Sequence, residues 1–86
     1  MSMTSEKLIG KVTHYYNKLG VAVVRLNDML EVGQTVHIKG KHDDFTQEVE
    51  EMQFDHHFAS KGIPWQRVGI KVREKTHAND LVYAVV

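Results

Sequence analysis

Short stretches in which apolar and polar residues alternate recur along this chain, and turn-forming residues separate them. Valine, isoleucine and threonine account for 21 of the 86 residues, and β-branched side chains favour strands over helices. The longest purely aliphatic run, residues 21–24, is far too short for a transmembrane helix. These features predict an all-β domain, and the chain length leaves room for one.

Six strands are expected from the alternation. They span residues 8–16, 21–26, 35–39, 45–54, 67–74 and 81–86. Short strands at this spacing favour a closed or nearly closed six-stranded antiparallel β-barrel, because closure removes the edges that invite aggregation. Residues 1–7 are expected to be a flexible N-terminus ahead of a single barrel domain over residues 8–86.

The fourth expected strand changes face along its length. Val49 shares the parity of the first half, whereas Met52 and Phe54 take the other parity. A strand changes face only where a residue is inserted, so we expect a β-bulge near Glu50-Glu51. A helix over residues 46–53 is the competing interpretation because Gln, Glu and Met favour helices. The flanking strands favour the strand.

Composition excludes several kinds of site. The absence of cysteine rules out disulfides, thiolate metal sites and a thiol nucleophile. Eleven basic residues balance eleven acidic ones, which argues against a broad basic field but allows a local patch. The chain has no phosphate-binding loop, so no nucleotide triphosphate and no other cofactor is expected. The first ten residues lack an apolar stretch, so we expect a cytoplasmic protein that does not contact membranes.

The six histidines suggest a metal site, but their spacing does not support one. His56 and His57 are neighbours that would project to opposite faces of a strand. The His-Asp-Asp run at 42–44 lies in a turn, where such residues are common for backbone reasons. Ser60 lies near His57, yet no orienting acid or oxyanion donor can be named. We therefore expect no metal site and no catalytic residue.

A basic stripe is the main electrostatic feature. Lys71, Arg73 and Lys75 repeat at two-residue spacing, which places them on the outer face of the fifth expected strand. Lys39 and Lys41 would extend the stripe if the third strand lay close to it. Such a stripe could bind phosphates in a salt-sensitive manner. An ordinary solvated strand face, whose charge limits aggregation, is the simpler interpretation.

Aromatic side chains offer stacking contacts. The candidates are Tyr15, Tyr16, Phe54, Phe58 and Trp65. The alternation places His14 with Val12 towards the core, Tyr15 towards the solvent and Phe54 in the core. Trp65 follows a proline in a loop, where it is either a plug of the barrel or a contact residue, and the sequence leaves both open.

Five sequence blocks follow one another in a recognisable order. They are IGKVTHYY at 9–16, GVAVV at 20–24, LEVGQTVHIKG at 30–40, VEEMQ at 49–53 and VGIKV at 68–72. In this order they resemble the second-domain β-barrel of translational GTPases such as elongation factor Tu, and the small translation elongation factor-like proteins. The chain departs from that family at residues 61–67, where a Gly-Asp pair is usual, and at residues 76–80, which keep only Asp80.

The resemblance implies a standalone, non-catalytic binding module that makes weak contact with transfer RNA or ribosomal RNA. It places phosphate contacts and stacking on Arg67, Lys71, Arg73, Lys75, Trp65 and Phe58. The alternative is a protein–protein interaction module with a larger protein as partner, because a similar barrel is appended to some collagenase-family peptidases. The altered loop at 63–65 leaves open whether a site is lost or gained there.

Overall fold

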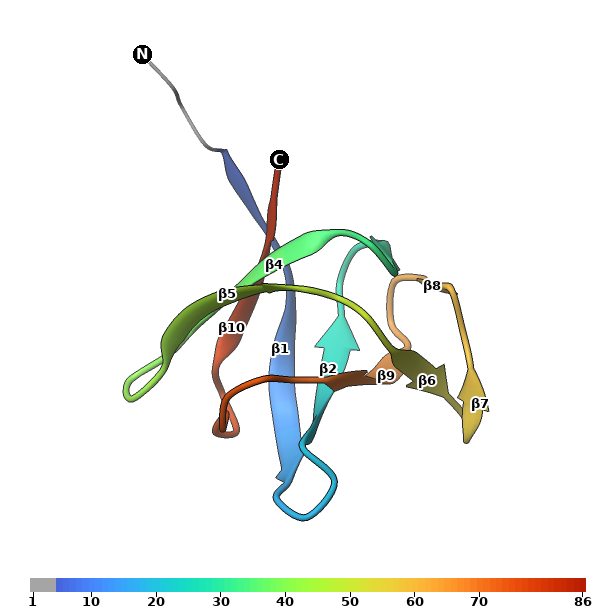
Figure 1. Ribbon diagram of the computed structural model, residues 1–86. Coiled ribbons are helices and arrows are strands. Elements are labelled where there is room, and N and C mark those ends of the chain that lie inside the picture. The colour runs from blue at the N-terminus through green and yellow to red at the C-terminus, as the bar shows by residue number, and fades with distance from the viewer. Residues whose placement is uncertain (1–4) are drawn as a thin grey trace.

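The computed structural model describes residues 5–86, which contain ten strands and no helix (Figure 1). The strands are β1 (Glu6–Tyr16), β2 (Val21–Leu26), β3 (Leu30–Glu31), β4 (Thr35–Lys39), β5 (Asp44–Glu48), β6 (Met52–Phe54), β7 (His57–Phe58), β8 (Lys61–Gly62), β9 (Arg67–Lys71) and β10 (Leu81–Val85). The all-β prediction is therefore confirmed. The single helix considered as an alternative over residues 46–53 does not form.

Eight strands form one antiparallel sheet in the order β5-β4-β10-β1-β2-β9-β6-β7, and β3 pairs with β8 apart from it. β5 pairs with β4 and β6 pairs with β9, so the chain at residues 49–51 passes from one end of the sheet order to the other. Figure 1 shows this stretch arching across the strongly bent sheet. Within residues 5–86 no backbone ladder closes the sheet, so the closed six-stranded barrel is not confirmed.

The core consists of the inward side chains of the bent sheet. Sixteen buried apolar residues from all the longer strands form one cluster. On β4 the buried residues are Val36 and Ile38, and on β9 they are Val68 and Ile70. Every second residue of these strands is thus buried, as the alternation predicts.

The face change expected at Glu50-Glu51 takes the form of an interruption. Pairing stops at Glu48 and resumes at Met52, and both glutamates between the buried Val49 and Met52 are exposed. The core position predicted for Phe54 is wrong, since this side chain is 40% exposed. β9 pairs with β6 only at Met52 and Gln53, so Phe54 lies beyond the end of the core.

The predicted facing of two residues in β1 is also wrong. The register between β1 and β2 shifts between Val12 and His14, which inserts one extra residue into β1. His14 is consequently exposed, and Tyr15 is half-buried and packs against the core. The prediction assumed an unbroken alternation in this strand, so it assigned the two residues to the opposite faces.

Three two-residue strands, β3, β7 and β8, were not expected from the sequence. Of the N-terminal segment expected to be flexible, residues 1–4 lie outside the described residues, and β1 begins at Glu6, which pairs with Val85. No helix suited to crossing a membrane occurs in residues 5–86.

Candidate functional site

A groove of about 600 Å³ crosses the outer face of the sheet where β2, β9 and β6 lie side by side. Its floor is formed by Val21 and Val23 of β2 and by Gly69 of β9. A Cβ at position 69 would lie 3.1 Å from the Val21 side chain. Because residue 69 is glycine, no side chain fills the groove at this point. The groove thus presents an apolar strip between polar walls.

Charged groups of both signs line this groove. Arg67 and Lys71 flank Gly69 along β9, and Glu51 and Asp55 add carboxylates. The ammonium of Lys71 donates a hydrogen bond of 2.7 Å to the carbonyl of Leu19, which holds the β1–β2 turn beside the groove. An apolar floor with mixed charges matches a polypeptide surface better than a polyanion.

The structure brings together two of the four cations assigned to phosphate contact. Arg67 and Lys71 line the groove, whereas Arg73 and Lys75 follow the end of β9. The guanidinium of Arg73 lies 3.5 Å from the carboxylate of Glu50. The four cations therefore do not form one strand face, because β9 ends at Lys71.

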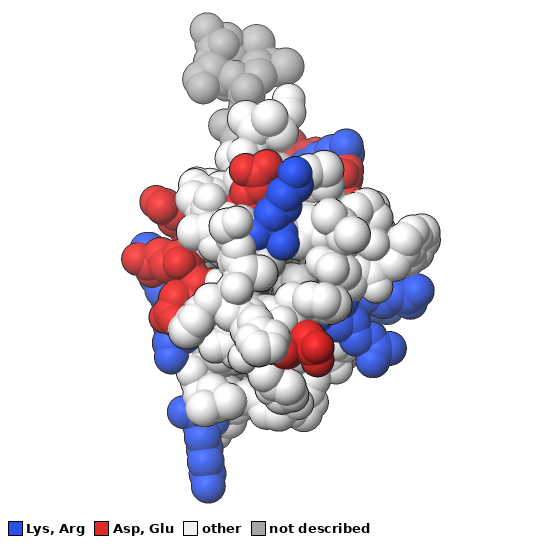
Figure 2. Space-filling view, turned by 90° about the vertical axis from the view of Figure 1, so that its right-hand side faces the viewer, with Lys and Arg blue, Asp and Glu red and all other residues white. Residues whose placement is uncertain are grey.

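The expected extension of the stripe through Lys39 and Lys41 does not occur. Lys39 ends β4, and β10, β1 and β2 lie between β4 and β9 in the sheet. Figure 2 shows blue and red groups interspersed around a largely white face. Cationic groups on this side of the molecule are thus interrupted by acidic and uncharged surface.

The two aromatic residues assigned to stacking lie outside the groove. Trp65 and Phe58 are 73% and 74% exposed, so Trp65 does not plug the sheet. The guanidinium of Arg25 lies 5.7 Å from the centre of the Trp65 ring, a cation–π distance. Phe58 borders a separate shallow hollow with Val32 and Met52.

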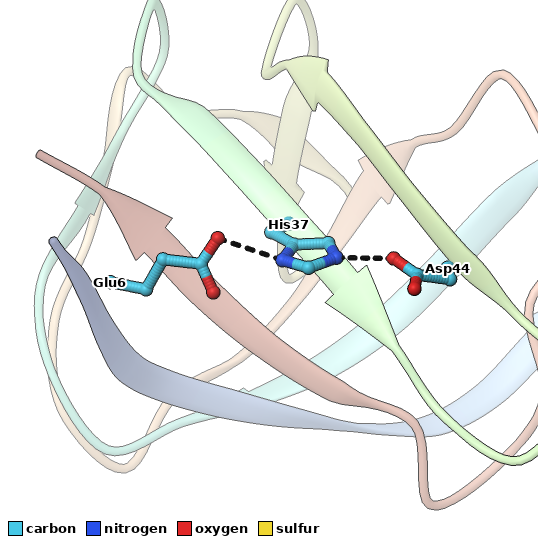
Figure 3. A network of polar contacts seen from close by, with 3 residues as sticks. All are labelled: Glu6, His37 and Asp44. Carbon is cyan, nitrogen blue, oxygen red and sulfur yellow. Dashed lines mark hydrogen bonds and ion pairs between the residues drawn. The ribbon is translucent and has the colours of Figure 1, made fainter. Parts of the chain in front are cut away.

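A histidine bridges three strands on the opposite part of the sheet. His37 of β4 lies between two carboxylates, with Nδ1 2.8 Å from Glu6 and Nε2 2.5 Å from Asp44 (Figure 3). The hydrogen bond to Asp44 is the main cause that raises the pKa of His37; burial opposes it and Glu6 adds to it. A protonated His37 donates to both carboxylates and ties β1 and β5 to β4.

A second polar cluster joins the β4–β5 turn to the segment before β10. The Nδ1 atom of His77 lies 2.7 Å from a carboxylate oxygen of Asp43. The buried carboxylate of Asp80 accepts the backbone N–H of His77 at 3.0 Å. One nitrogen or oxygen atom from each of these three residues lies within 4.8 Å of the other two. The His42 ring centre is 5.4 Å from that of His77.

We name these residues the Asp43–His77–Asp80 cluster, and the pKa values of its two carboxyl groups shift in opposite directions. Burial raises the pKa of Asp80, and the hydrogen bond to Asp43 raises it further. Burial also acts to raise the pKa of Asp43, but hydrogen bonds from Asp80 and His77 outweigh it and hold that pKa below its usual value. Asp80 is therefore the member that keeps a proton longer.

Sequence reasoning missed this cluster. It grouped His42 with Asp43 and Asp44 in one turn and did not connect them with His77, which is 34 residues away from Asp43. The two neighbouring aspartates contact different partners, since Asp43 meets His77 and Asp44 meets His37. No local signal in the sequence connects Asp43 with His77 or Asp80.

Comparisons with known proteins identify a sequence relative and closely similar solved structures. No family model matches the chain. This chain is 37% identical over 76 residues to a protein of Methanocaldococcus jannaschii described as an uncharacterized protease. The match covers 87% of this chain and 19% of that protein, so the chain spans about a fifth of the relative's length.

The fold is that of a peptidase C-terminal domain of known structure. The C-terminal domain of a putative U32 peptidase from Geobacillus thermoleovorans superposes with a TM-score of 0.85 at 22% identity, over 91% of each chain. Its selenomethionine variant gives a TM-score of 0.84 at 23% identity, over 88% of this chain and 96% of the other.

These findings overturn the translation-factor assignment. The relative is described as a protease, and the superposed structures come from a putative U32 peptidase. The five sequence blocks correspond largely to turns and alternating strands, which unrelated β-domains also contain. The RNA-binding function drawn from that resemblance is therefore wrong, whereas the similarity to a peptidase appendage agrees with the alternative.

Proposed function

We propose that this chain is a non-catalytic accessory module that binds the catalytic part of a U32-type peptidase. One observation carries the proposal: the chain matches a segment that makes up 19% of a protease at 37% identity. The remaining four fifths of that relative accompany the segment in one chain. The same surface in this chain would contact an equivalent catalytic partner.

The polar groups of the chain favour binding over catalysis. In the described part of the chain, Ser60 forms no side-chain hydrogen bond with His57 or with a carboxylate. The nucleophile–base–acid arrangement of a serine hydrolase therefore has no counterpart around it. His37 and His77 are each engaged with carboxylates, and within residues 5–86 neither forms a side-chain hydrogen bond with a serine.

The groove over β2, β9 and β6 is the contact surface we assign to this partner. Its apolar floor, at Val21 and Val23, supplies area to bury, and its mixed charges supply complementary polar contacts. Leu19 is 60% exposed at one end of the groove, so it is available to a partner without any rearrangement of the core.

The test uses the Methanocaldococcus protease from which the matching segment has been deleted. We expect this chain to bind it with one-to-one stoichiometry in isothermal titration calorimetry, and Leu19→Glu to weaken that binding. Ile63→Glu is the matched control, because Ile63 is also an exposed aliphatic residue but lies outside the groove.

Three results would contradict the proposal in separate ways. Absence of a complex would rule out the peptidase as partner. Equal affinity of the Leu19→Glu and Ile63→Glu variants would rule out the groove as the contact surface. Hydrolysis of unfolded casein by the purified 86-residue chain would show that the module is itself an enzyme.

A further inference from the structure

We propose that Asp43, His77 and Asp80, with His42 beside them, form a binding site for a divalent transition-metal ion such as Zn²⁺. The proposal is independent of the peptidase partner, because the site lies on the β4–β5 turn and the segment before β10. None of the residues of the groove belongs to it.

The geometry brings the necessary atoms together. One ligand atom from each of the three residues lies within 4.8 Å of the others, and the His77 nitrogen already faces the Asp43 carboxylate at 2.7 Å. Zinc binds histidine nitrogen and carboxylate oxygen at about 2.0–2.2 Å, so two of its ligands lie roughly 3–4 Å apart. To reach that spacing, the most widely separated of the three atoms must approach one another by no more than about 1–2 Å.

The backbone holds the buried ligand in place. The amide of Val12 donates to the Asp80 carbonyl, and the Val12 carbonyl accepts the amide of Asn79, so this turn is fixed to β1. A Cβ at position 40 would collide with the Asp80 carboxylate, which explains a glycine there. A preformed carboxylate lowers the ordering cost of binding an ion.

His77 is the one basic side chain paired with the carboxylates of this cluster in the described chain. Among residues 5–86, no lysine or arginine forms an ion pair with Asp43 or Asp80. The hydroxyl of Thr76, directly before His77, is buried and lacks a hydrogen-bond partner in the described chain. A buried hydroxyl without a protein partner is a group that a water molecule or an ion can satisfy.

The ligand types select the class of metal. One or two imidazoles with two carboxylates suit Zn²⁺, Co²⁺ or Ni²⁺, whereas Mg²⁺ and Ca²⁺ prefer sites made entirely of oxygen. His42 is exposed and its ring centre lies 5.4 Å from that of His77, so it borders the site without belonging to the three-residue ligand set. A bound ion would link the β4–β5 turn to the β10 segment.

The experiment is a titration of the untagged, EDTA-treated chain with ZnCl₂ at pH 7.5, followed by calorimetry and by amide NMR. We expect one equivalent to bind, with chemical-shift changes centred on residues 40–43 and 76–80. The denaturant midpoint should rise with Zn²⁺ and return with EDTA, because an ion bound only by the folded state stabilises it. An equal concentration of MgCl₂ should leave the spectrum unchanged.

Variants locate the site. Asp43→Asn and His77→Gln should each weaken Zn²⁺ binding by more than the roughly 10–100-fold that loss of an outer-shell partner costs. His57→Gln is the control, since this exposed histidine lies on β7, outside the cluster. The buried Asp80 is left unchanged, so folding is preserved. No binding, or binding that persists in His77→Gln and disappears in His57→Gln, would overturn the proposal.

Discussion

The long strands and residues 50–66 differ in length and in how many of their side chains are buried. The long strands β1, β2, β4, β5, β9 and β10 have 5 to 11 residues each, and in all of them except β1 every second residue is buried. Residues 50–66, which we name the short-strand segment, contain strands of two or three residues. Only Met52 and Gly62 are buried there.

The backbone shows the same contrast. Three of the four non-glycine residues with positive φ in the described chain, Asp55, His56 and Trp65, lie in the short-strand segment. Such conformations cost free energy and persist where the surroundings impose them. The long strands therefore supply stability, and the short-strand segment supplies exposed surface, including two exposed aromatic rings.

The largest effect is expected from Leu26→Ala in β2. Leu26 is fully buried, so its truncation leaves a cavity and should lower the free energy of unfolding by about 2–5 kcal/mol. Urea denaturation followed by circular dichroism measures this loss. Leu19→Ala, at an exposed leucine of the adjacent turn, should cost less than about 0.5 kcal/mol. Similar losses of stability for both variants would contradict the conclusion that the buried residues of the long strands supply the stability.

Gly62→Ala tests the point at which the two regions meet. A Cβ at position 62 would lie 2.6 Å from the Leu26 side chain and 3.2 Å from that of Val68. Overpacking of this kind should lower stability by about 1–3 kcal/mol, although the residue belongs to the short-strand segment. Lys61→Ala, in the same two-residue strand but exposed, is the control. A neutral Gly62→Ala would mean that β8 is free to move away from the core.

A pH-dependent contribution is expected from His37, which ties three long strands together. Its pKa in the folded state is raised above 6.5, so its stabilising effect is complete below pH 6.5 and is lost as the pH rises through the folded-state pKa. The difference in unfolding free energy between wild type and His37→Gln should thus be larger at pH 6 than at pH 8.5. A difference that is constant across this range would exclude a charged His37 bridge.

The smallest effect is expected from Phe58→Ala in the short-strand segment. Three quarters of the Phe58 side chain is exposed, so its removal should change the free energy of unfolding by no more than about 0.5 kcal/mol. The same urea experiment measures it. A loss comparable with that of Leu26→Ala would show that the hollow beside Phe58 is part of the core.

The sequence predicted the long strands well, because alternation reports directly which face is buried. The bounds of β2 and β4 agree with the predicted strands, and the break between Val49 and Met52 was found from parity alone. The same reasoning failed at His14, because the inserted residue in β1 leaves no compositional trace.

The candidate sites were less accessible to sequence reasoning. The groove depends on strand neighbours: Gly69 is significant only because Val21 of β2 lies beside it. His77 meets Asp43 across 34 residues, and local spacing carries no information on such a contact. The expected RNA-contact residues came from the translation-factor resemblance and not from contacts of this kind, and the resemblance led to the wrong partner.

Amide NMR of the labelled chain bound to the segment-deleted Methanocaldococcus protease tests the central claim most directly. We predict that shift changes concentrate at residues 16–23, 51–56 and 67–71, which line the groove, and leave β4 and β5 unaffected. Changes centred on β4 and β5, or none in the presence of excess protease, would contradict the account of this chain as a peptidase-binding module.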